Sequence, residues 1–396
     1  MSSPQSRLPL LVDLPAGPTA ADILSAQLAR ADADPATVIA PVPLTGPHVS
    51  QELRDRLITA ISPDVPIREA DGQVVLTTSG STATAKAVVH SMDAVRSSTR
   101  ALHEYLGGAG HWLCALPLHT SAGFMTVARA VLSGTVAVPT SSLGGAEPFT
   151  SHSFLSACEQ MPNTGRRYIS LVPAMARRLS DDTAALRALA GFDAVLIGGQ
   201  AVPADLTNVL GQSGAKVVLS YGATETCGGC VYDGHALPGV SVTIGPDNRV
   251  IVSGPMVMIG YRGASATQRQ QHESDAPESA QTRSITMPDL GHIDDSGRLH
   301  IDGRVDDVVL VNGMNVSVSA VATMLRELGL SAIVCTADDL LFAVTPTGIA
   351  PDESEAAVAR VIEHFGVKLR LQVLRDIPLT AAGKPDRRAL AAQLSM

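Results

Sequence analysis

The sequence predicts an α/β protein, with a large N-terminal domain of mostly parallel sheets covered by helices plus a β-rich part, and a small α+β C-terminal domain. Three observations support this prediction. The chain has 396 residues, of which 45% are apolar, enough for more than one hydrophobic core. Short apolar runs alternate with segments of helical period as far as Val231. Beyond Val231, short strand-like segments follow one another.

The strands are predicted from short apolar runs bounded by turn residues. Such runs are typical of strands buried on both faces, as in a parallel sheet. Residues 1–70, rich in Ala, Pro and Asp, contain no strong motif. The predicted strands lie at 73–78, 87–90, 112–116, 136–138, 168–172, 194–197 and 217–220.

Helices are predicted between most of these strands. The segment 93–106 is amphipathic, with Ser91 or Asp93 as the residue that caps its start and two glycines, 107 and 108, at its end. Further helices are expected at 123–132 and 203–210. Because helices alternate with strands, the sheet that they cover should be largely parallel.

The character of the chain changes near Val231 and again after Arg304. Strands are predicted at 241–244, 250–253, 298–301 and 308–311. The polar segment 263–284 is expected to be a mobile surface loop. We therefore predict an N-terminal domain over 1–304, whose β-rich part covers about 231–304, and a C-terminal domain over 305–396, with a hinge between them.

The composition excludes several classes of function. A net charge of −9 argues against a protein that binds nucleic acid or anionic membranes through its charge. The apolar run at 8–12 is too short for a signal peptide, and no stretch is suited to span a membrane. The five cysteines are odd in number and widely spaced, unlike a disulfide framework, so a reduced, cytoplasmic protein is expected.

Cys227 and Cys230 form a C-x-x-C pair. A zinc ribbon needs a second pair, which the sequence lacks. A thioredoxin-type site would place the pair at the start of a helix near the beginning of a small domain. Structural or incidental cysteines are therefore favoured, with redox or metal chemistry as the alternative.

Lysine is scarce, so its positions are informative. Only four lysines occur, and Arg supplies the other 25 of the 29 cations. Lys86 closes the loop 77–86 (TTSGSTATAK) between two predicted strands. Such a loop can aim backbone N–H groups and hydroxyls at phosphate oxygens, with the lysine as a mobile counter-charge. It is not a Walker A loop, because Ala87 stands where Ser or Thr is required. Taken alone, it is equally well explained as a polar hairpin turn.

Five later segments place glycines or polar groups at or after the ends of predicted elements. In 196–203 (LIGGQAVP) the glycine pair allows close backbone approach to a flat ligand. The segment 221–225 (YGATE) offers an aromatic ring, a hydroxyl and a carboxylate suited to Mg²⁺. The others are 288–291 (PDLG), 303–307 (GRVDD) and 378–384 (PLTAAGK), which ends on another scarce lysine.

In this order the six motifs resemble the signatures of the adenylate-forming superfamily, which includes the acyl- and aryl-CoA synthetases. The resemblance covers residues 74–390. It is strongest to the o-succinylbenzoate–CoA ligases of menaquinone synthesis, because of the segments 115–119 (ALPLH), 167–173 (RYISLVP) and 221–233. It implies a two-step acid–thiol ligase that uses ATP, Mg²⁺ and CoA. Such an enzyme adenylates 2-succinylbenzoate and then forms 2-succinylbenzoyl-CoA, releasing AMP and pyrophosphate. A small carboxylic acid is the implied partner; the oligomeric state stays open, with a homodimer as one option.

The resemblance also implies a role for each motif. The implied catalytic residues are Lys384, which bridges the acyl carboxylate and the α-phosphate, His119 at the acyl pocket, Thr224 at the α-phosphate and Glu225 as the Mg²⁺ ligand. The implied cofactor-binding residues are Ser79, Gly80, Ser81, Thr82 and Lys86 at the β- and γ-phosphates, Gly198, Gly199, Gln200, Tyr221 and Gly222 near the adenine, Asp289 and Arg304 at the ribose, and Gly313 at the CoA tunnel.

The implied hinge is Asp306, about which the C-terminal domain rotates between the two half-reactions. Candidates for holding the distal carboxylate of the succinyl chain are Ser170, Thr226 and Arg129. Adenylation joins two anions, so cations and hydrogen-bond donors must offset the charge that develops at the α-phosphate.

Departures from the family pattern keep other functions open. Ala83 and Ala85 stand where the family loop has Gly and Pro, and Ala83 would be strained at a positive φ. Pro288 replaces the Gly that precedes the ribose-binding Asp. The alternatives are an enzyme that adenylates another acid for CoA or a carrier protein, and a degenerate nucleotide-binding protein with weak catalysis.

Overall fold

The computed structural model describes residues 7–46, 49–67, 71–78, 85–262, 283–311, 314–337, 340–345, 351–374, 376–378 and 385–394. The chain divides into two compact units. Unit 1 comprises residues 1–242 and 252–285, and unit 2 comprises residues 243–251 and 286–396. The predicted domain boundary at 304 falls inside unit 2, and rotation of residues 305–396 as a separate cap stays a prediction. Within the described ranges no helix is long and apolar enough to cross a membrane.

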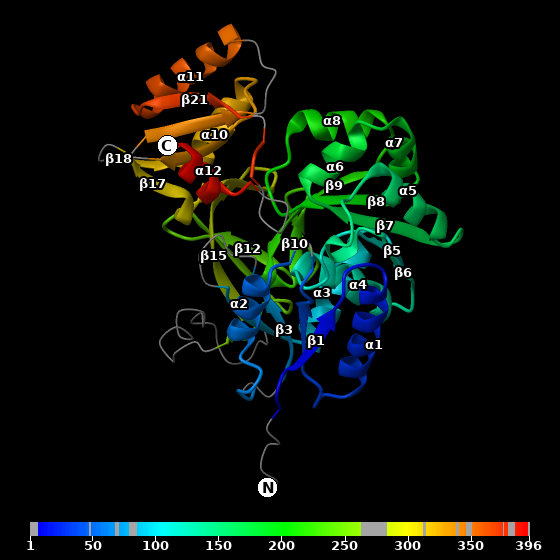
Figure 1. Ribbon diagram of the computed structural model, residues 1–396. Coiled ribbons are helices and arrows are strands. Elements are labelled where there is room, and N and C mark those ends of the chain that lie inside the picture. Colours follow the sequence, from blue (N-terminus) through cyan, green and yellow to red (C-terminus); the bar gives the residue numbers. More distant parts are fainter. Residues whose placement is uncertain are drawn as a thin grey trace. The chain divides into compact units, whose positions relative to one another are not determined.

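The first seventy residues, in which the sequence revealed no motif, begin a five-stranded sheet in unit 1. Its order is β1-β2-β3-β4-β14, with β1, β2 and β3 parallel and β4 antiparallel to both of its neighbours. Helices α1 and α2 connect the first three strands (Figure 1). The elements are β1 (Leu10–Leu14), α1 (Thr19–Ala33), β2 (Ile39–Pro43), α2 (Gln51–Ile61), β3 (Gly72–Thr77), β4 (Ala87–Ser91) and β14 (Gly260–Tyr261).

The second sheet of unit 1 has seven strands in the order β11-β10-β9-β8-β7-β5-β6. The strands from β9 to β6 are parallel, as predicted, whereas β10 and β11 add an antiparallel edge. The strands are β5 (Gly110–Cys114), β6 (Ala137–Pro139), β7 (Arg166–Leu171), β8 (Ala194–Gly198), β9 (Val217–Ala223), β10 (Gly228–Tyr232) and β11 (His235–Ala236).

This sheet separates two hydrophobic cores. Successive residues point to opposite faces, so Trp112 packs with helices α1, α3 and α4, and Leu113 packs with α5 to α8. Since both faces are buried, the strands read as continuous apolar runs. The helices are α3 (Met92–Tyr105), α4 (Ser121–Leu132), α5 (Ser151–Gln160), α6 (Pro173–Ser180), α7 (Thr183–Ala190) and α8 (Ala204–Gln212).

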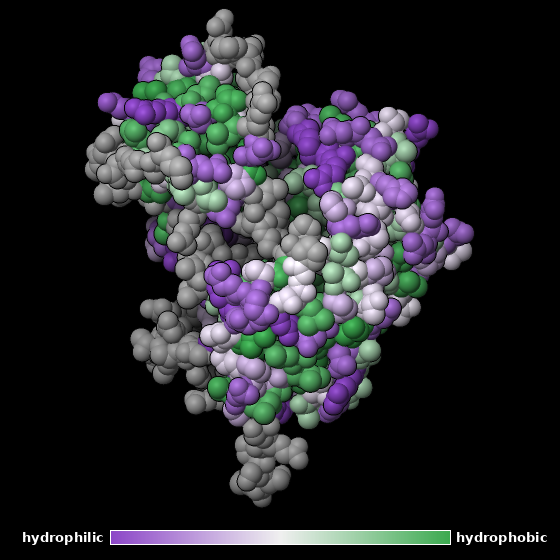
Figure 2. All heavy atoms as spheres, in the orientation of Figure 1, coloured by the Kyte–Doolittle hydropathy of each residue, from purple (hydrophilic) through white to green (hydrophobic). Residues whose placement is uncertain are grey.

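Helix ends and helix faces follow local sequence signals. The Ser91 hydroxyl accepts a hydrogen bond from the Ala94 N–H (3.1 Å), so of the two predicted candidates Ser91 is the residue that caps α3. Helix α8 buries Leu206 and Leu210, four residues apart, and leaves its other side to solvent. Hydrophilic side chains accordingly gather over α6 and α8 on the face that Figure 2 shows.

A four-stranded sheet follows, in the order β12-β13-β15-β16, in which β15 and β16 are antiparallel. Strand β15 was not predicted, and it begins at Arg283, inside the segment expected to be a loop; residues 263–282 lie outside the described residues. The strands are β12 (Ser241–Ile244), β13 (Arg249–Gly254), β15 (Arg283–Ile293) and β16 (Leu299–Arg304).

The rest of unit 2 is a small α+β arrangement, as predicted. A hairpin of β17 and β18 is followed by a three-stranded sheet, β19-β20-β21, and Val321, Leu341 and Val361 lie in its buried core. The elements are β17 (Val308–Val311), β18 (Met314–Ser317), α10 (Val318–Glu327), β19 (Ile333–Ala337), β20 (Leu340–Thr345), α11 (Pro351–Phe365), β21 (Leu369–Val373) and α12 (Arg387–Leu394).

Candidate functional site

The predicted site residues fall into three groups. Unit 1 holds Lys86, His119, Gly198, Gly199, Gln200, Tyr221, Gly222, Thr224 and Glu225. Unit 2 holds Asp289 and Arg304. Outside the described residues lie Ser79, Gly80, Ser81, Thr82, Gly313 and Lys384.

Thr224 and Glu225 lie in a short 3₁₀ turn, Thr224–Thr226, between β9 and β10. Tyr221 and Gly222 belong to the end of β9, which is three residues longer than predicted. A Cβ at Gly222 would lie 2.1 Å from the carbonyl oxygen of Gly228, so only glycine allows the two strands to meet here. Close strand packing therefore explains Gly222 without a ligand.

The turn is held from several sides. The buried Thr226 hydroxyl accepts a hydrogen bond from the Ala223 N–H (3.0 Å) and donates one to the Gly228 carbonyl (2.7 Å). The Met258 N–H donates to the Glu225 carbonyl at 2.8 Å. Because these bonds fix the backbone, the Thr224 hydroxyl and the Glu225 carboxylate are presented in a defined direction.

The Glu225 carboxylate has a partner that sequence reasoning missed. The Tyr261 hydroxyl, on β14, donates a hydrogen bond to Glu225 Oε1 at 2.7 Å. Burial and the neighbouring carboxylate raise the pKa of Tyr261, which keeps the phenol protonated as a donor. Lys86 Nζ lies 5.2 Å from the centre of the Tyr261 ring, within cation–π range. The sequence signal for Tyr261 was only an aromatic residue after Gly260.

A backbone hydrogen bond joins the two ends of the loop 77–86, the predicted phosphate loop. Lys86 is exposed, and its backbone pairs with that of Thr78, whose N–H donates to the Lys86 carbonyl at 2.8 Å. The loop between them (79–84) lies outside the described residues. The structure therefore brings Lys86, Tyr261 and Glu225 together from three separate elements.

The segment that carries His119 lies beside the same turn. The Thr120 hydroxyl caps α4 through the Gly123 N–H (3.3 Å), and the Ser121 hydroxyl lies 3.4 Å from that of Thr224. The His119 imidazole is half-buried, and desolvation lowers its pKa to about 4. His119 is therefore neutral at pH 7, so one ring nitrogen can donate a hydrogen bond and the other can accept one.

The glycine pair at the end of β8 serves two purposes. A Cβ at Gly198 would lie 2.6 Å from the Ser220 carbonyl oxygen, so β8 and β9 require glycine there. Gly199 is exposed and has φ +78°, in the left-handed region that favours glycine. Gln200, half-buried, follows directly. Their role at an adenine ring stays a proposal.

In unit 2, Asp289 lies opposite Arg304 on the paired strands β15 and β16. Arg304 Nη1 and Asp289 Oδ1 form an ion pair at 3.2 Å, and Asp289 is only 7% exposed. The expected proximity of these two residues is confirmed; the contact with a ribose stays a proposal.

The candidates for the distal carboxylate have different surroundings. The Thr226 hydroxyl is used within its own turn. Arg129, on α4, is 3% exposed, and its guanidinium lies 4.9 Å from the centre of the Trp112 ring. Ser170 is buried on β7. Of the three, Arg129 alone carries a positive charge.

The C-x-x-C pair shows no sign of redox or metal chemistry in the described residues. Cys227 and Cys230 are unpaired and fully buried, and burial raises the pKa of both thiols, to about 12 for Cys230. A thiol that stays protonated is a poor nucleophile and a poor metal ligand. No group of three metal-ligating side chains occurs in the part of the chain that the structure describes.

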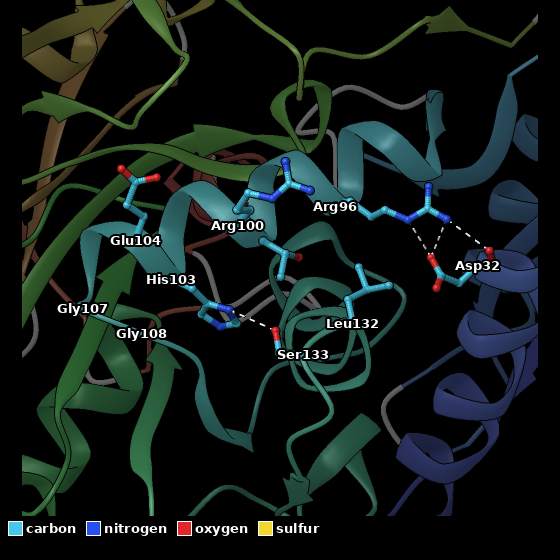
Figure 3. Close-up of a pocket in the computed structure, with 10 residues that line it drawn as sticks. Asp32, Arg96, Arg100, His103, Glu104, Gly107, Gly108, Leu132 and Ser133 are labelled. Carbon is cyan, nitrogen blue, oxygen red and sulfur yellow. Dashed lines mark hydrogen bonds and ion pairs between the residues drawn. The ribbon is translucent and has the colours of Figure 1, made fainter.

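A hollow of about 680 Å³ in unit 1 lies elsewhere, against α3 and the ends of α1 and α4 (Figure 3). Arg96 turns toward Asp32, with which it forms an ion pair at 2.7 Å, and the His103 ring faces Ser133. None of the predicted site residues lines it. The arginines and acids around it offset one another, so the hollow does not favour an anion.

Comparisons with known proteins found a matching family, curated relatives and solved structures of the same fold. The profile of the AMP-binding enzyme family matches residues 10–262. A probable 2-succinylbenzoate–CoA ligase of Mycobacterium tuberculosis is 32% identical over 96% of this chain and 97% of its own length. Two solved structures share the fold. NpsA of Klebsiella oxytoca in complex with 3-hydroxyanthranilyl-AMSN has a TM-score of 0.79 and 16% identity, and the match covers 98% of this chain and 89% of that one. The o-succinylbenzoate CoA synthetase of Bacillus subtilis in complex with ATP and magnesium has a TM-score of 0.72 and 18% identity, and the match covers 96% of this chain and 89% of that one.

Proposed function

Because the chain belongs to the AMP-binding enzyme family, we propose that it is an acid–thiol ligase that activates 2-succinylbenzoate with ATP and transfers the acyl group to CoA. The observation that carries the proposal is the similarity to the probable M. tuberculosis ligase along nearly the whole length of both chains. The contacts among polar groups in unit 1 support it as well. Tyr261 contacts both Glu225 and Lys86, and Thr224 precedes Glu225 in the same turn, so a hydroxyl, a carboxylate and a cation that the chemistry needs are present.

The reaction has two steps. In the first, a carboxylate oxygen of the acid bonds to the α-phosphorus of ATP, the bond to the β-phosphate oxygen breaks, and pyrophosphate leaves. In the second, the CoA sulfur bonds to the acyl carbon, AMP leaves, and the thiol proton is released. Both substrates of the first step are anions, so positive charge and hydrogen-bond donors lower its barrier.

Each part of the turn has a proposed task. The Thr224 hydroxyl donates to the α-phosphate, and neutral His119 contacts the acid beside it without adding charge. The Glu225 carboxylate fits Mg²⁺, a hard cation bound by few carboxylates together with substrate phosphates. Bound Mg²⁺ would offset charge on the phosphates. Lys384 and the phosphate loop supply the remaining donors. Between the two steps, residues 305–396 rotate about Asp306, so that Lys384 leaves the site and the segment with Gly313 enters it.

Asp289 and Arg304 are proposed to bind the ribose. A cytoplasmic location fits ATP and CoA as substrates and the five unpaired cysteines. The Ala83 and Ala85 departures remain relevant to the affinity for ATP, and Ala83 lies outside the described residues.

The decisive experiment is ATP–pyrophosphate exchange over a panel of aromatic and aliphatic acids that includes 2-succinylbenzoate, followed by detection of the CoA thioester. We expect exchange to be fastest with 2-succinylbenzoate and a thioester to form when CoA is added. Exchange with a different acid, or without a thioester, would indicate another substrate or a carrier-protein acceptor. No exchange with any acid would indicate a nucleotide-binding protein without this catalysis.

A further inference from the structure

His90 connects the phosphate-loop hairpin to the turn that carries Thr224. It lies on β4, four residues after Lys86, and is fully buried. Its Nε2 lies 2.8 Å from the Thr224 carbonyl oxygen, and its Nδ1 lies 3.2 Å from the Cys227 sulfur. Both ring nitrogens therefore meet groups at the two ends of the Thr224–Thr226 turn.

The two contacts define the tautomer of the ring. Desolvation lowers the pKa of His90 to about 4, so the imidazole is neutral at pH 7. A carbonyl oxygen can only accept, so Nε2 carries the proton and donates it to Thr224. Nδ1 is then an acceptor, and the Cys227 thiol, whose sulfur lies 3.2 Å away, is its donor.

The backbone at Cys227 also points to its side chain. Cys227 has φ +52°, in the left-handed region where glycine is favoured. Such residues persist where their surroundings hold them in place. The Ser98 hydroxyl donates to the Cys227 carbonyl (3.3 Å), so α3 holds its backbone while His90 holds its thiol.

We propose that His90 and Cys227 are positioning residues, which hold the Thr224–Glu225 turn in its nucleotide-binding conformation through the chain of hydrogen bonds from the Cys227 thiol to His90 Nδ1 and from His90 Nε2 to the Thr224 carbonyl. The proposal rests on the proposed function, in which this turn binds ATP. It gives the first cysteine of the C-x-x-C pair a role as a hydrogen-bond donor.

Three substitutions at Cys227 distinguish the effect of the thiol hydrogen bond from the effect of the left-handed backbone. Cys227→Ser keeps a donor, Cys227→Ala removes it, and Cys227→Gly removes it while relieving the left-handed backbone. The full chain is tested by calorimetric titration with MgATP in the absence of any acid. We expect Cys227→Ala and Cys227→Gly to weaken MgATP binding about tenfold, and Cys227→Ser to stay within about threefold of the wild type. Cys114→Ala, which removes an equally buried thiol on β5, is the control and should bind as the wild type does.

Substitutions at His90 test the other half of the chain. The amide nitrogen of a glutamine can take the place of Nε2, whereas that of an asparagine can only take the place of Nδ1. His90→Gln should therefore retain most of the MgATP affinity, and His90→Asn should lose about tenfold. Thermal melting of each variant verifies that it is folded.

A spectroscopic readout does not depend on activity. In protein with ¹⁵N-labelled histidine, the His90 ring should appear at pH 7 as the neutral tautomer with the proton on Nε2. The Nδ1 resonance should move in Cys227→Ala and stay close to the wild-type position in Cys227→Ser. A proton on Nδ1, equal binding by the serine, alanine and glycine variants, or recovery in Cys227→Gly alone would overturn the proposal. Failure of pyrophosphate exchange with every acid would overturn only the proposed function, because MgATP binding and the ring resonances are measured without it.

Discussion

The hydroxyl of Tyr261 donates a hydrogen bond to Glu225 Oε1 at 2.7 Å, across 36 residues of sequence. The two residues come from β14 and from the turn after β9, which belong to different sheets of unit 1. Lys86 lies against the other part of the same tyrosine, over its ring. One side chain thus orients the carboxylate proposed to bind Mg²⁺ and contacts the lysine of the phosphate loop.

Removing this phenol should impair the adenylation step. We expect Tyr261→Phe, which keeps the ring under Lys86, to lower kcat/KM for MgATP about tenfold in pyrophosphate exchange, since hydrogen bonds to charged groups are stronger than average. Tyr105→Phe is a matched control, because the Tyr105 hydroxyl donates to Asp233 Oδ2 (3.0 Å) away from the turn. Similar losses in both variants would argue against the role of Tyr261.

Glycine at position 222 should be required for the fold of the turn. In Gly222→Ala the new methyl group would meet the Gly228 carbonyl, and we expect the free energy of unfolding to fall by about 3 kcal/mol. Gly211, in α8, has open space around it, and Gly211→Ala should raise that free energy by about 0.5 kcal/mol. Urea unfolding of the two variants measures both effects. An unaffected Gly222→Ala would show that the strands can separate without cost.

His119 should govern the acid more than the nucleotide. We expect His119→Ala to raise KM for 2-succinylbenzoate about tenfold while KM for ATP changes less than about twofold, because His119 is proposed to contact the acid. His111→Ala serves as the comparison, since the His111 ring bonds only to the backbone of Thr164 and Val136 in the contacts described. An unchanged KM and kcat for the acid would leave His119 with a structural role alone.

Lys384 should act in the first half-reaction only. We expect Lys384→Ala to slow adenylate formation by about 10²–10³-fold while preformed acyl-adenylate is still converted to the thioester. Lys368→Ala, at an exposed lysine in the same part of the chain, should affect neither step. Equal loss of both half-reactions would contradict the role proposed for Lys384.

Buried neutral histidines should make the protein sensitive to mild acid. The pKa values of His90 and His103 are lowered to about 4, mainly by desolvation, so between pH 6.5 and 4 the unfolded chain binds protons that the folded chain does not. The free energy of unfolding should therefore fall as the pH falls through this window, by up to on the order of 3 kcal/mol for each histidine. Urea unfolding at pH 7, 6 and 5 measures the slope, and His103→Gln should reduce it. A free energy that is flat from pH 7 to 5 would be inconsistent with buried neutral rings.

Local sequence signals predicted the elements that depend on neighbouring residues. The apolar runs at 112–116 and 194–197 correspond to buried parallel strands, and Ser91 caps α3. Burial on both faces of a strand and capping of a helix can each be recognised from a few consecutive residues. Within the first seventy residues, the fully buried strand β2 was missed because it carries prolines within its apolar run. Strand β15 was missed because Pro288, Asp289 and Gly291 interrupt its apolar pattern.

By itself, the sequence determined the class of fold, the order of the motifs and the identity of the groups that can carry the chemistry. Only the tertiary structure decided which of those groups meet. His90 reaches the Thr224 carbonyl across 134 residues, and Tyr261 reaches Glu225, because separate strands bring them together. Such contacts depend on sheet order and register, which a residue pattern of period 2 or 3.6 does not encode.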